Sequence, residues 1–128
     1  MSRDPYQLEA FQLADSLVVS LYRATARFPV AERFGLQSQL RRAAVSVTAN
    51  LGEGCARRSE RDYLHFVAIS IGSASEARYL VGLSARLGFL DTSVAQPLAH
   101  GYGRVARALQ SLATVLSSGR GPRSEALK

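Results

Sequence analysis

The residues best suited to covalent chemistry in this chain are its one cysteine, Cys55, and its two histidines, His65 and His100. Cys55 precedes Arg57 and Arg58, and nearby guanidinium groups can lower a thiol pKa. A nucleophilic cysteine also needs a base, however, and no histidine adjoins it in sequence. We therefore interpret Cys55 as an inert thiol.

The histidines have the beginnings of a metal-site spacing but not the whole of it. Asp62 stands three residues before His65, which is half of the pattern found in di-iron helical bundles. Pro97 occupies the matching position before His100, so the second half is missing. A dinucleotide-binding fingerprint follows a strand, but the Gly-x-Gly pairs at 52–54 and 101–103 follow no predicted strand. The sequence predicts no catalytic residue, no metal site and no cofactor.

Arginines concentrate in the middle of the chain. Arginine suits bidentate phosphate contacts, so we predict nucleic-acid binding by six of them. They are Arg33, Arg41, Arg42, Arg57, Arg58 and Arg61. Only Glu53 and Glu60 oppose them in that window, which leaves a local balance of +4. Two alternatives stay open: internal pairing with Glu53 and Glu76, or idle surface charge. Few aromatic residues interleave, which argues against a dedicated platform for stacking single strands.

Two of these arginines and two polar residues near them suggest structural roles. Arg41 and Arg42 differ by about 100° around a helix, so one can face a ligand while the other pairs inside the assembly. Arg42 and Glu53 are about three helical turns apart and share a face. Asn50 lies at the edge of an apolar stripe, where a polar residue can fix register and oligomeric state. The alternative for Asn50 is simple exposure to water.

Composition defines the class of protein. The chain has 128 residues, a mass of 13.8 kDa and a net charge of +6, and 47% of its residues are hydrophobic. This describes one globular domain rather than a disordered or fibrous chain. A single cysteine excludes an internal disulfide and fits the cytoplasm. We see no signal peptide and no membrane-spanning run.

Apolar periodicity predicts four helices, at about 5–28, 36–54, 60–87 and 92–117, with a flexible basic tail over 118–128. Asp4 with Gln7 and Ser59 with Asp62 have the spacing of N-terminal capping boxes. Gly52 and Gly54 are expected to end the second helix, and Gly88 the third. Four long helices with short loops favour an all-α, antiparallel up-down-up-down four-helix bundle over residues 1–117.

The third and fourth helices carry further signals. Apolar or small residues cover most sides of the third, more than a single bundle can bury. They indicate a second interface with another subunit. The fourth helix has His100, Arg104 and Arg107 on its polar face. Gly101 and Gly103 interrupt it, which suggests close backbone contact or a local bend.

Three segments together carry a family resemblance. They are Gln39-Leu40-Arg41-Arg42-Ala43-Ala44-Val45-Ser46-Val47, Asn50-Leu51-Gly52-Glu53-Gly54 and Ile71-Gly72-Ser73-Ala74-Ser75-Glu76. The chain resembles the four-helix-bundle proteins encoded in intervening sequences of bacterial large-subunit (23S) ribosomal RNA genes. The likeness covers roughly Phe11 to Leu90 and is poor in the fourth helix. Gly52 departs from it, where the family generally has alanine, and so does Ile71, where a polar or basic residue is common.

The resemblance implies a ring of bundles, typically a homopentamer, with no established enzymatic activity. A related branch serves as the accessory protein of diversity-generating retroelements, where a basic pentamer engages reverse transcriptase and nucleic acid. Seven residues match characteristic positions, and several of them are expected to hold the bundle and ring together. They are Arg41, Arg42, Asn50, Glu53, Gly54, Ser73 and Glu76.

Two functional hypotheses follow. The first is a non-enzymatic, ring-forming helical bundle that binds RNA, or an RNA–protein complex, through its arginine-rich surface. The alternative is a protein-interaction scaffold without nucleic-acid binding. An enzyme that uses Cys55, His65 or His100 is the least favoured reading.

Overall fold

Four α-helices make up most of residues 3–118, the part of the chain that this computed structural model describes. They are α1 (Glu9–Thr25), α2 (Leu36–Cys55), α3 (Glu60–Arg86) and α4 (Thr92–Ser117), with short 3-10 turns at Pro5–Gln7 and Val30–Glu32. Within the described range there is no strand. The predicted all-α class is confirmed, and of the predicted tail only Ser118 belongs to the described residues.

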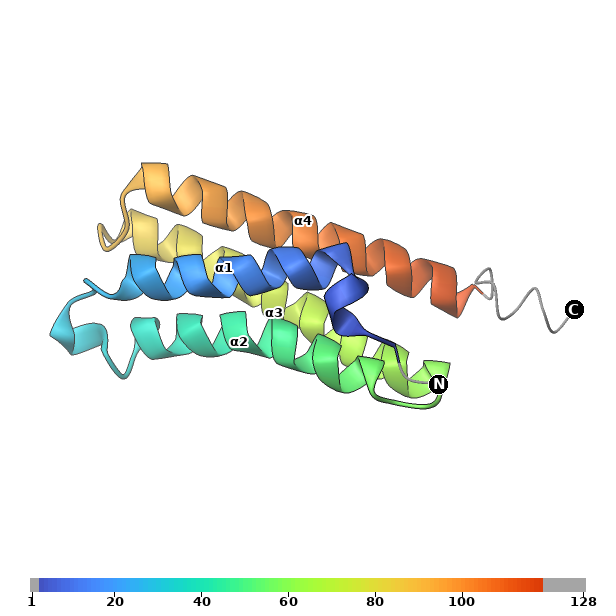
Figure 1. Cartoon of the computed structure of the whole chain (residues 1–128). Coiled ribbons are helices and arrows are strands. Elements are labelled where there is room, and N and C mark those ends of the chain that lie inside the picture. Colours follow the sequence, from blue (N-terminus) through green and yellow to red (C-terminus); the bar gives the residue numbers. More distant parts are fainter. Residues whose placement is uncertain (1–2, 119–128) are drawn as a thin grey trace, which may run out of the picture.

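The helices pack side by side as a bundle. α1 lies against α2 and α4, and α3 lies against the same two helices. Figure 1 shows the α1–α2 and α3–α4 loops at one end and the α2–α3 loop at the other. The start of the chain is held at that second end, because the Arg3 backbone N–H donates to the Cys55 carbonyl at 2.9 Å.

The predicted boundaries of α3 are confirmed by its caps. The Ser59 hydroxyl accepts a hydrogen bond from the Asp62 backbone N–H at 3.1 Å. At the other end, Gly88 has a φ of +81°, and the Phe89 N–H donates to the Ser84 carbonyl at 2.9 Å. This is the left-handed glycine ending that the sequence predicts, because glycine adopts such a φ without steric cost.

The beginning of the first helix differs from the prediction. Asp4 does cap a turn, accepting from the Tyr6 N–H at 3.0 Å, but that turn is the short 3-10 segment. Leu8 is extended, and α1 begins only at Glu9. The turn folds back on α1, where Gln12 Nε2 donates to the Tyr6 carbonyl at 2.6 Å and the Tyr6 and Phe11 rings meet edge to face. These contacts compensate for the break in the helix.

The core lies between the four helices. The apolar stripe of α2 is buried: Leu36, Leu40, Ala43, Val47 and Leu51. One seam of α3 is buried as well: Tyr63, Val67, Ser70, Ala74, Ala77 and Val81. The other apolar sides of α3 are covered only in part, because Leu80 is buried whereas Ile69 is 37% exposed and Ala68 is exposed beside it. The chain alone leaves part of the apolar surface of α3 uncovered.

Two glycines allow helices to approach closely. A Cβ at Gly54 would lie 2.9 Å from the Phe66 Cβ, where α2 meets α3. A Cβ at Gly101 would lie 2.7 Å from Leu17 Cδ2, where α4 meets α1. The predicted close contact at Gly101 is confirmed. The capping role expected of Gly52 and Gly54 is wrong, because both lie inside α2 and neither has a positive φ.

Candidate nucleic-acid interface

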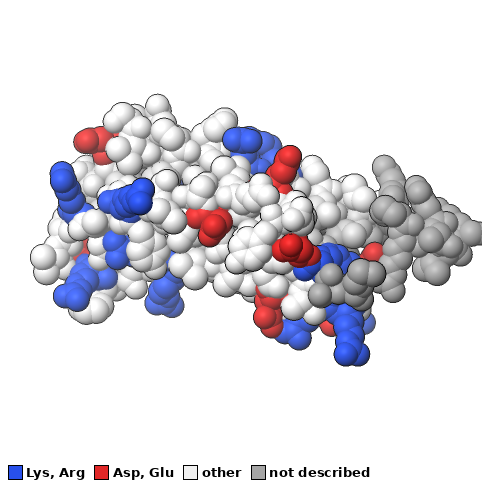
Figure 2. Space-filling model, viewed as in Figure 1, with Lys and Arg blue, Asp and Glu red and all other residues white. Residues whose placement is uncertain are grey.

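The six predicted arginines do not form one patch. Arg33, Arg41 and Arg42 lie at the end with the α1–α2 loop, which we call the first-loop group. Arg57, Arg58 and Arg61 lie at the α2–α3 loop, the second-loop group (Figure 1). Arg42 lies inside α2 and is followed by 13 more residues of that helix, so at about 1.5 Å per residue the groups lie roughly 20–25 Å apart. Figure 2 shows basic side chains toward both ends and a further group between them along the upper edge.

Arg41 in the first-loop group is a structural residue. Its Nε donates to Thr25 Oγ1 at 2.9 Å and its Nη2 donates to the Tyr22 carbonyl at 3.1 Å. The guanidinium also lies 4.4 Å from the centroid of the Tyr22 ring. Gln37 Nε2 donates to the Thr25 carbonyl at 2.7 Å. These contacts add hydrogen bonds to carbonyls in the last turn of α1, where the backbone donors of the helix run out.

Arg33 and Arg42 are free to meet a ligand. Both are exposed, and both line a shallow groove of about 290 Å³ at this end of the bundle. Phe34 lines the same groove with 89% of its surface exposed, and the Arg33 guanidinium lies 5.5 Å from its ring centroid. Charged side chains beside an exposed aromatic ring can contact a phosphate and a base together.

The expected internal pairing is found only in part. Glu53 forms an ion pair with Arg57, one helical turn away. Glu76 accepts a hydrogen bond from Gln39 Nε2 at 3.3 Å. Arg42 shares a groove of about 400 Å³ with Glu76 but forms no ion pair with it. Among the described residues, Glu53–Arg57 is the only ion pair, so most of the basic charge is uncompensated.

The second-loop group is a small basic cluster at the α2–α3 loop. Arg57 is fixed by its pairing with Glu53, and its guanidinium lies 5.0 Å from the Phe66 ring centroid. Arg58 and Arg61 are exposed, and neither has a hydrogen-bond or ion-pair partner in the described part of the chain. These two side chains can reach a polyanion without breaking an existing contact.

Asn50, Ser73 and Gly54 contribute to packing between α2 and α3. Asn50 is half-buried, and its Nδ2 donates to the Ser46 carbonyl at 2.9 Å and to Ser46 Oγ at 3.0 Å. Ser46 Oγ and Ser73 Oγ lie 2.7 Å apart and share a hydrogen bond. This network joins α2 to α3 inside one chain. Any role of Asn50 in setting oligomeric state stays a prediction.

The three candidates for covalent or metal chemistry lie apart. Cys55 is fully buried, and burial raises the pKa of its thiol, which disfavours the reactive thiolate. His65 is exposed and contacts the Phe66 ring edge to face, and His100 is exposed on α4. In the part of the chain that the structure covers, no cluster of histidine, cysteine or acidic residues could hold a metal ion. Nor is any helix there long and apolar enough to cross a bilayer.

One arginine cluster escaped the sequence analysis. Arg78 on α3 and Arg107 on α4 meet over Gly103, although 29 positions separate the two arginines in sequence. Arg107 was recognised on the polar face of its helix, but its alignment with Arg78 depends on how α3 and α4 pack. The available signal in the sequence was Gly103, a glycine inside α4 that costs helix stability and so indicates a close approach at that position.

The fold and the exposed arginines define an all-α bundle with basic ends. The chain belongs to the 23S rRNA-intervening sequence protein family, whose profile matches residues 6–111. The match includes most of α4, so it extends beyond the range that the motifs indicated. No curated protein matches the chain.

A solved structure confirms the fold. It is a protein of unknown function from the S23 ribosomal protein family of Bacteroides thetaiotaomicron. The two share 18% sequence identity with a TM-score of 0.73, over 81% of this chain and 97% of the other. At this identity the likeness shows the fold and leaves function to the residues themselves.

Proposed function

We propose that the chain is a non-enzymatic nucleic-acid-binding protein that engages RNA, or an RNA–protein complex, through the exposed arginines at the two ends of an antiparallel up-down-up-down bundle. The observation that carries the proposal is the lack of internal partners for Arg42, Arg58 and Arg61, which are exposed and unpaired among the described residues. We place the protein in the cytoplasm, where its lone cysteine would stay reduced.

The spacing of the two groups favours an extended ligand. Each group presents two or three charges, too few for tight binding alone. Groups about 20–25 Å apart would contact phosphates several nucleotides from one another, and their contributions would combine as in a bivalent ligand. The local unpaired charge thus favours an extended RNA strand or helix that reaches both ends of the bundle over a small ligand at either end.

The same proposal includes assembly into a homo-oligomeric ring, with five subunits as the expected number. Its support is the outer face of α2 and α3, where Val45 is 41% and Ile69 37% exposed. Ala49 and Gly72 on the same two helices are exposed as well. Small and apolar residues permit close approach by a second copy. A pentamer would carry five times the +6 of one chain, which would raise the association rate with a polyanion.

Binding is tested by fluorescence anisotropy with a labelled RNA of about 16 nucleotides, a length within the range that single modules cover. The variants are Arg33→Ser with Arg42→Ser, and Arg58→Ser with Arg61→Ser. Loss of two phosphate contacts should reduce the slope of log K against log salt by about 1.4. The matched control is Arg23→Ser with Arg27→Ser, which removes the same charge from exposed positions at the α1–α2 end but outside the groove that Arg33 and Arg42 line. Equal weakening in all three variants, or no binding by the wild type, would contradict the proposal.

Assembly is tested separately by light scattering. Ile69→Glu places a charge on the proposed interface and should lower the mass to that of a single chain. Leu87→Glu is the control, because Leu87 is 54% exposed but lies at the end of α3. A monomeric wild type would overturn the ring without affecting the RNA-binding proposal.

The second candidate is a protein-interaction scaffold, and the exposed outer face of α2 and α3 is the observation that favours it. It predicts that the wild type forms a defined oligomer and captures a protein partner, while RNA binding is absent at all salt concentrations. Co-purification followed by ultraviolet absorbance ratios distinguishes the two candidates directly.

A further inference from the structure

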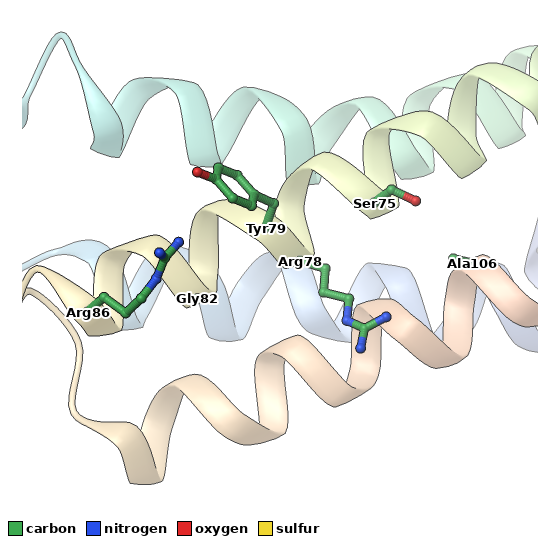
Figure 3. Close-up of a pocket in the computed structure, with 6 residues that line it drawn as sticks. All are labelled: Ser75, Arg78, Tyr79, Gly82, Arg86 and Ala106. Atoms are coloured by element: carbon green, nitrogen blue, oxygen red, sulfur yellow. The ribbon is translucent and has the colours of Figure 1, made fainter.

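A shallow groove between α3 and α4 lies outside both arginine groups described above. Its volume is about 390 Å³, within the range that small-ligand sites occupy. The residues that line it are Ser75, Arg78, Tyr79, Gly82, Arg86 and Ala106 (Figure 3). Two of the six are arginines, and the figure shows the Arg78 side chain extending from α3 across to α4.

Two guanidinium groups meet at one point beside this groove. The Nη1 atom of Arg107 lies 3.3 Å, and that of Arg78 lies 3.6 Å, from the position that a Cβ at Gly103 would occupy. Gly103 is itself buried, and these side chains cover it. The absence of a side chain at this position therefore lets two cations from different helices come together.

No acidic residue neutralises this pair in the described part of the chain. Neither Arg78 nor Arg107 forms an ion pair there. Glu9 lines a neighbouring groove together with Arg107 but lies beyond ion-pair distance of it. Glu76, the acidic residue nearest to Arg78 along α3, is hydrogen-bonded to Gln39 of α2. Two like charges in proximity repel each other, and a bound anion would relieve that repulsion.

A flat aromatic surface stands at the same groove. Tyr79 is 60% exposed, and the Arg86 guanidinium lies 5.8 Å from its ring centroid. The Ser75 hydroxyl is exposed one turn before it. An exposed ring beside cationic groups offers stacking to a planar group that is linked to an anion.

We propose that Arg78 and Arg107 form a phosphate-binding site over Gly103, with Arg86 and Tyr79 beside it, that takes the phosphate of a nucleotide unit. Phosphate fits better than a carboxylate because its several oxygens accept from two guanidinium forks at once. A phosphomonoester also carries nearly the two negative charges that the two arginines require. The nucleotide is either free or part of an RNA chain. This site does not depend on RNA binding by the loop groups, since a free nucleotide would satisfy it.

The test uses the full chain and two probes: adenosine 5′-monophosphate by calorimetry, and a labelled oligouridylate of about 12 nucleotides by anisotropy. The double variant Arg78→Ser with Arg107→Ser should weaken binding of at least one probe about tenfold or more, because each charge-assisted contact contributes substantially. The control is Arg23→Ser with Arg27→Ser, which should leave the affinity within about twofold. All four side chains are exposed, so circular dichroism should report an unchanged fold.

The probes separate the two sources of phosphate. Weakened binding of the mononucleotide assigns the site to a free nucleotide, and weakened binding of the oligomer alone assigns it to a phosphodiester chain. Binding of both probes that is unchanged in the double variant overturns the site, as does a wild type that binds neither probe. Persistent RNA binding that only the loop-group variants reduce would overturn this site while supporting the proposed function.

A charge-preserving variant tests the geometry. Arg78→Lys with Arg107→Lys keeps both charges but removes the planar forks. The proposal expects this variant to bind the affected probe at least about threefold more weakly than the wild type. Equal affinity would reduce the site to a diffuse positive field and contradict the specific contact proposed at Gly103.

Discussion

A pair of glycine-to-alanine substitutions two residues apart in α2 provides the sharpest test of the packing described above. Alanine favours a helix interior over glycine by about 1 kcal/mol, whatever the surroundings. At Gly52 a Cβ would meet nothing within 4 Å, so that preference acts alone. We expect Gly52→Ala to stabilise the protein by up to about 1 kcal/mol.

At Gly54 the same change meets the backbone of α3. The new Cβ would lie 2.9 Å from the Phe66 Cβ, 3.2 Å from Tyr63 Cδ1 and 3.5 Å from the Tyr63 carbonyl oxygen. A Cβ is tied to its own backbone, so the helices must separate rather than a side chain rotate. Overpacking of this kind costs about 1–3 kcal/mol, against a helix preference of about 1 kcal/mol. Gly54→Ala should therefore lower stability by up to about 2 kcal/mol.

The assay is urea unfolding followed by circular dichroism, at one protein concentration because assembly shifts apparent stability. The two variants should differ by about 1–3 kcal/mol, or roughly 3–12 °C in Tm for a chain of this size. Gly101→Ala should fall between them, since its Cβ meets Leu17 Cδ2, the movable tip of a side chain. A Gly54→Ala protein at least as stable as Gly52→Ala would refute the close approach of α2 and α3.

Three further predictions concern other parts of the bundle. Arg41→Met should lower the free energy of unfolding by about 1–3 kcal/mol, because its contacts with Thr25 and Tyr22 are lost. Arg42→Met should change the free energy of unfolding by less than about 0.5 kcal/mol. Equal effects of the two substitutions in urea unfolding would contradict the structural role of Arg41. Tyr102→Phe removes a fully buried hydroxyl that has no hydrogen-bond partner in the described structure. The free energy of unfolding should therefore stay the same or rise by up to about 1 kcal/mol. A clear loss of stability in urea unfolding would mean that the hydroxyl has a hydrogen-bond partner. Burial raises the pKa of the Cys55 thiol and raises the pKa of Tyr63 to about 12. Because these groups ionise at lower pH in the unfolded chain than in the folded one, the urea midpoint should fall as pH increases above about 9. Tyr63→Phe should make that fall less steep, and an unchanged slope would count against the raised pKa of Tyr63.

The sequence predicted the helices well because its signals are local. Ser59 and Gly88 act through neighbours only a few residues away, so the ends of α3 could be placed before any packing was known. The break before α1 could not be placed in this way. It depends on Gln12 and Phe11 reaching back to the Pro5–Gln7 turn, a contact whose strength periodicity does not report.

The candidate site was predicted by composition rather than by geometry. Composition identified Arg33, Arg42, Arg58 and Arg61, which are exposed and unpaired in the described chain. It could not separate Arg41, whose partners Thr25 and Tyr22 belong to another helix. Nor could composition divide the arginines into two groups, because a count over residues 33–61 does not show that 13 residues of α2 separate Arg42 from the α2–α3 loop.

The attachment of Arg3 to the end of α2 has a practical consequence for handling the protein. The Arg3 N–H is bonded to the Cys55 carbonyl, and its guanidinium lies 4.1 Å from the Tyr63 ring centroid. An affinity tag fused before residue 1 would therefore emerge next to the second-loop group. An acidic tag there would compete with a ligand for Arg58 and Arg61. Tag removal, or fusion at the other terminus, belongs in the design of every binding measurement on this protein.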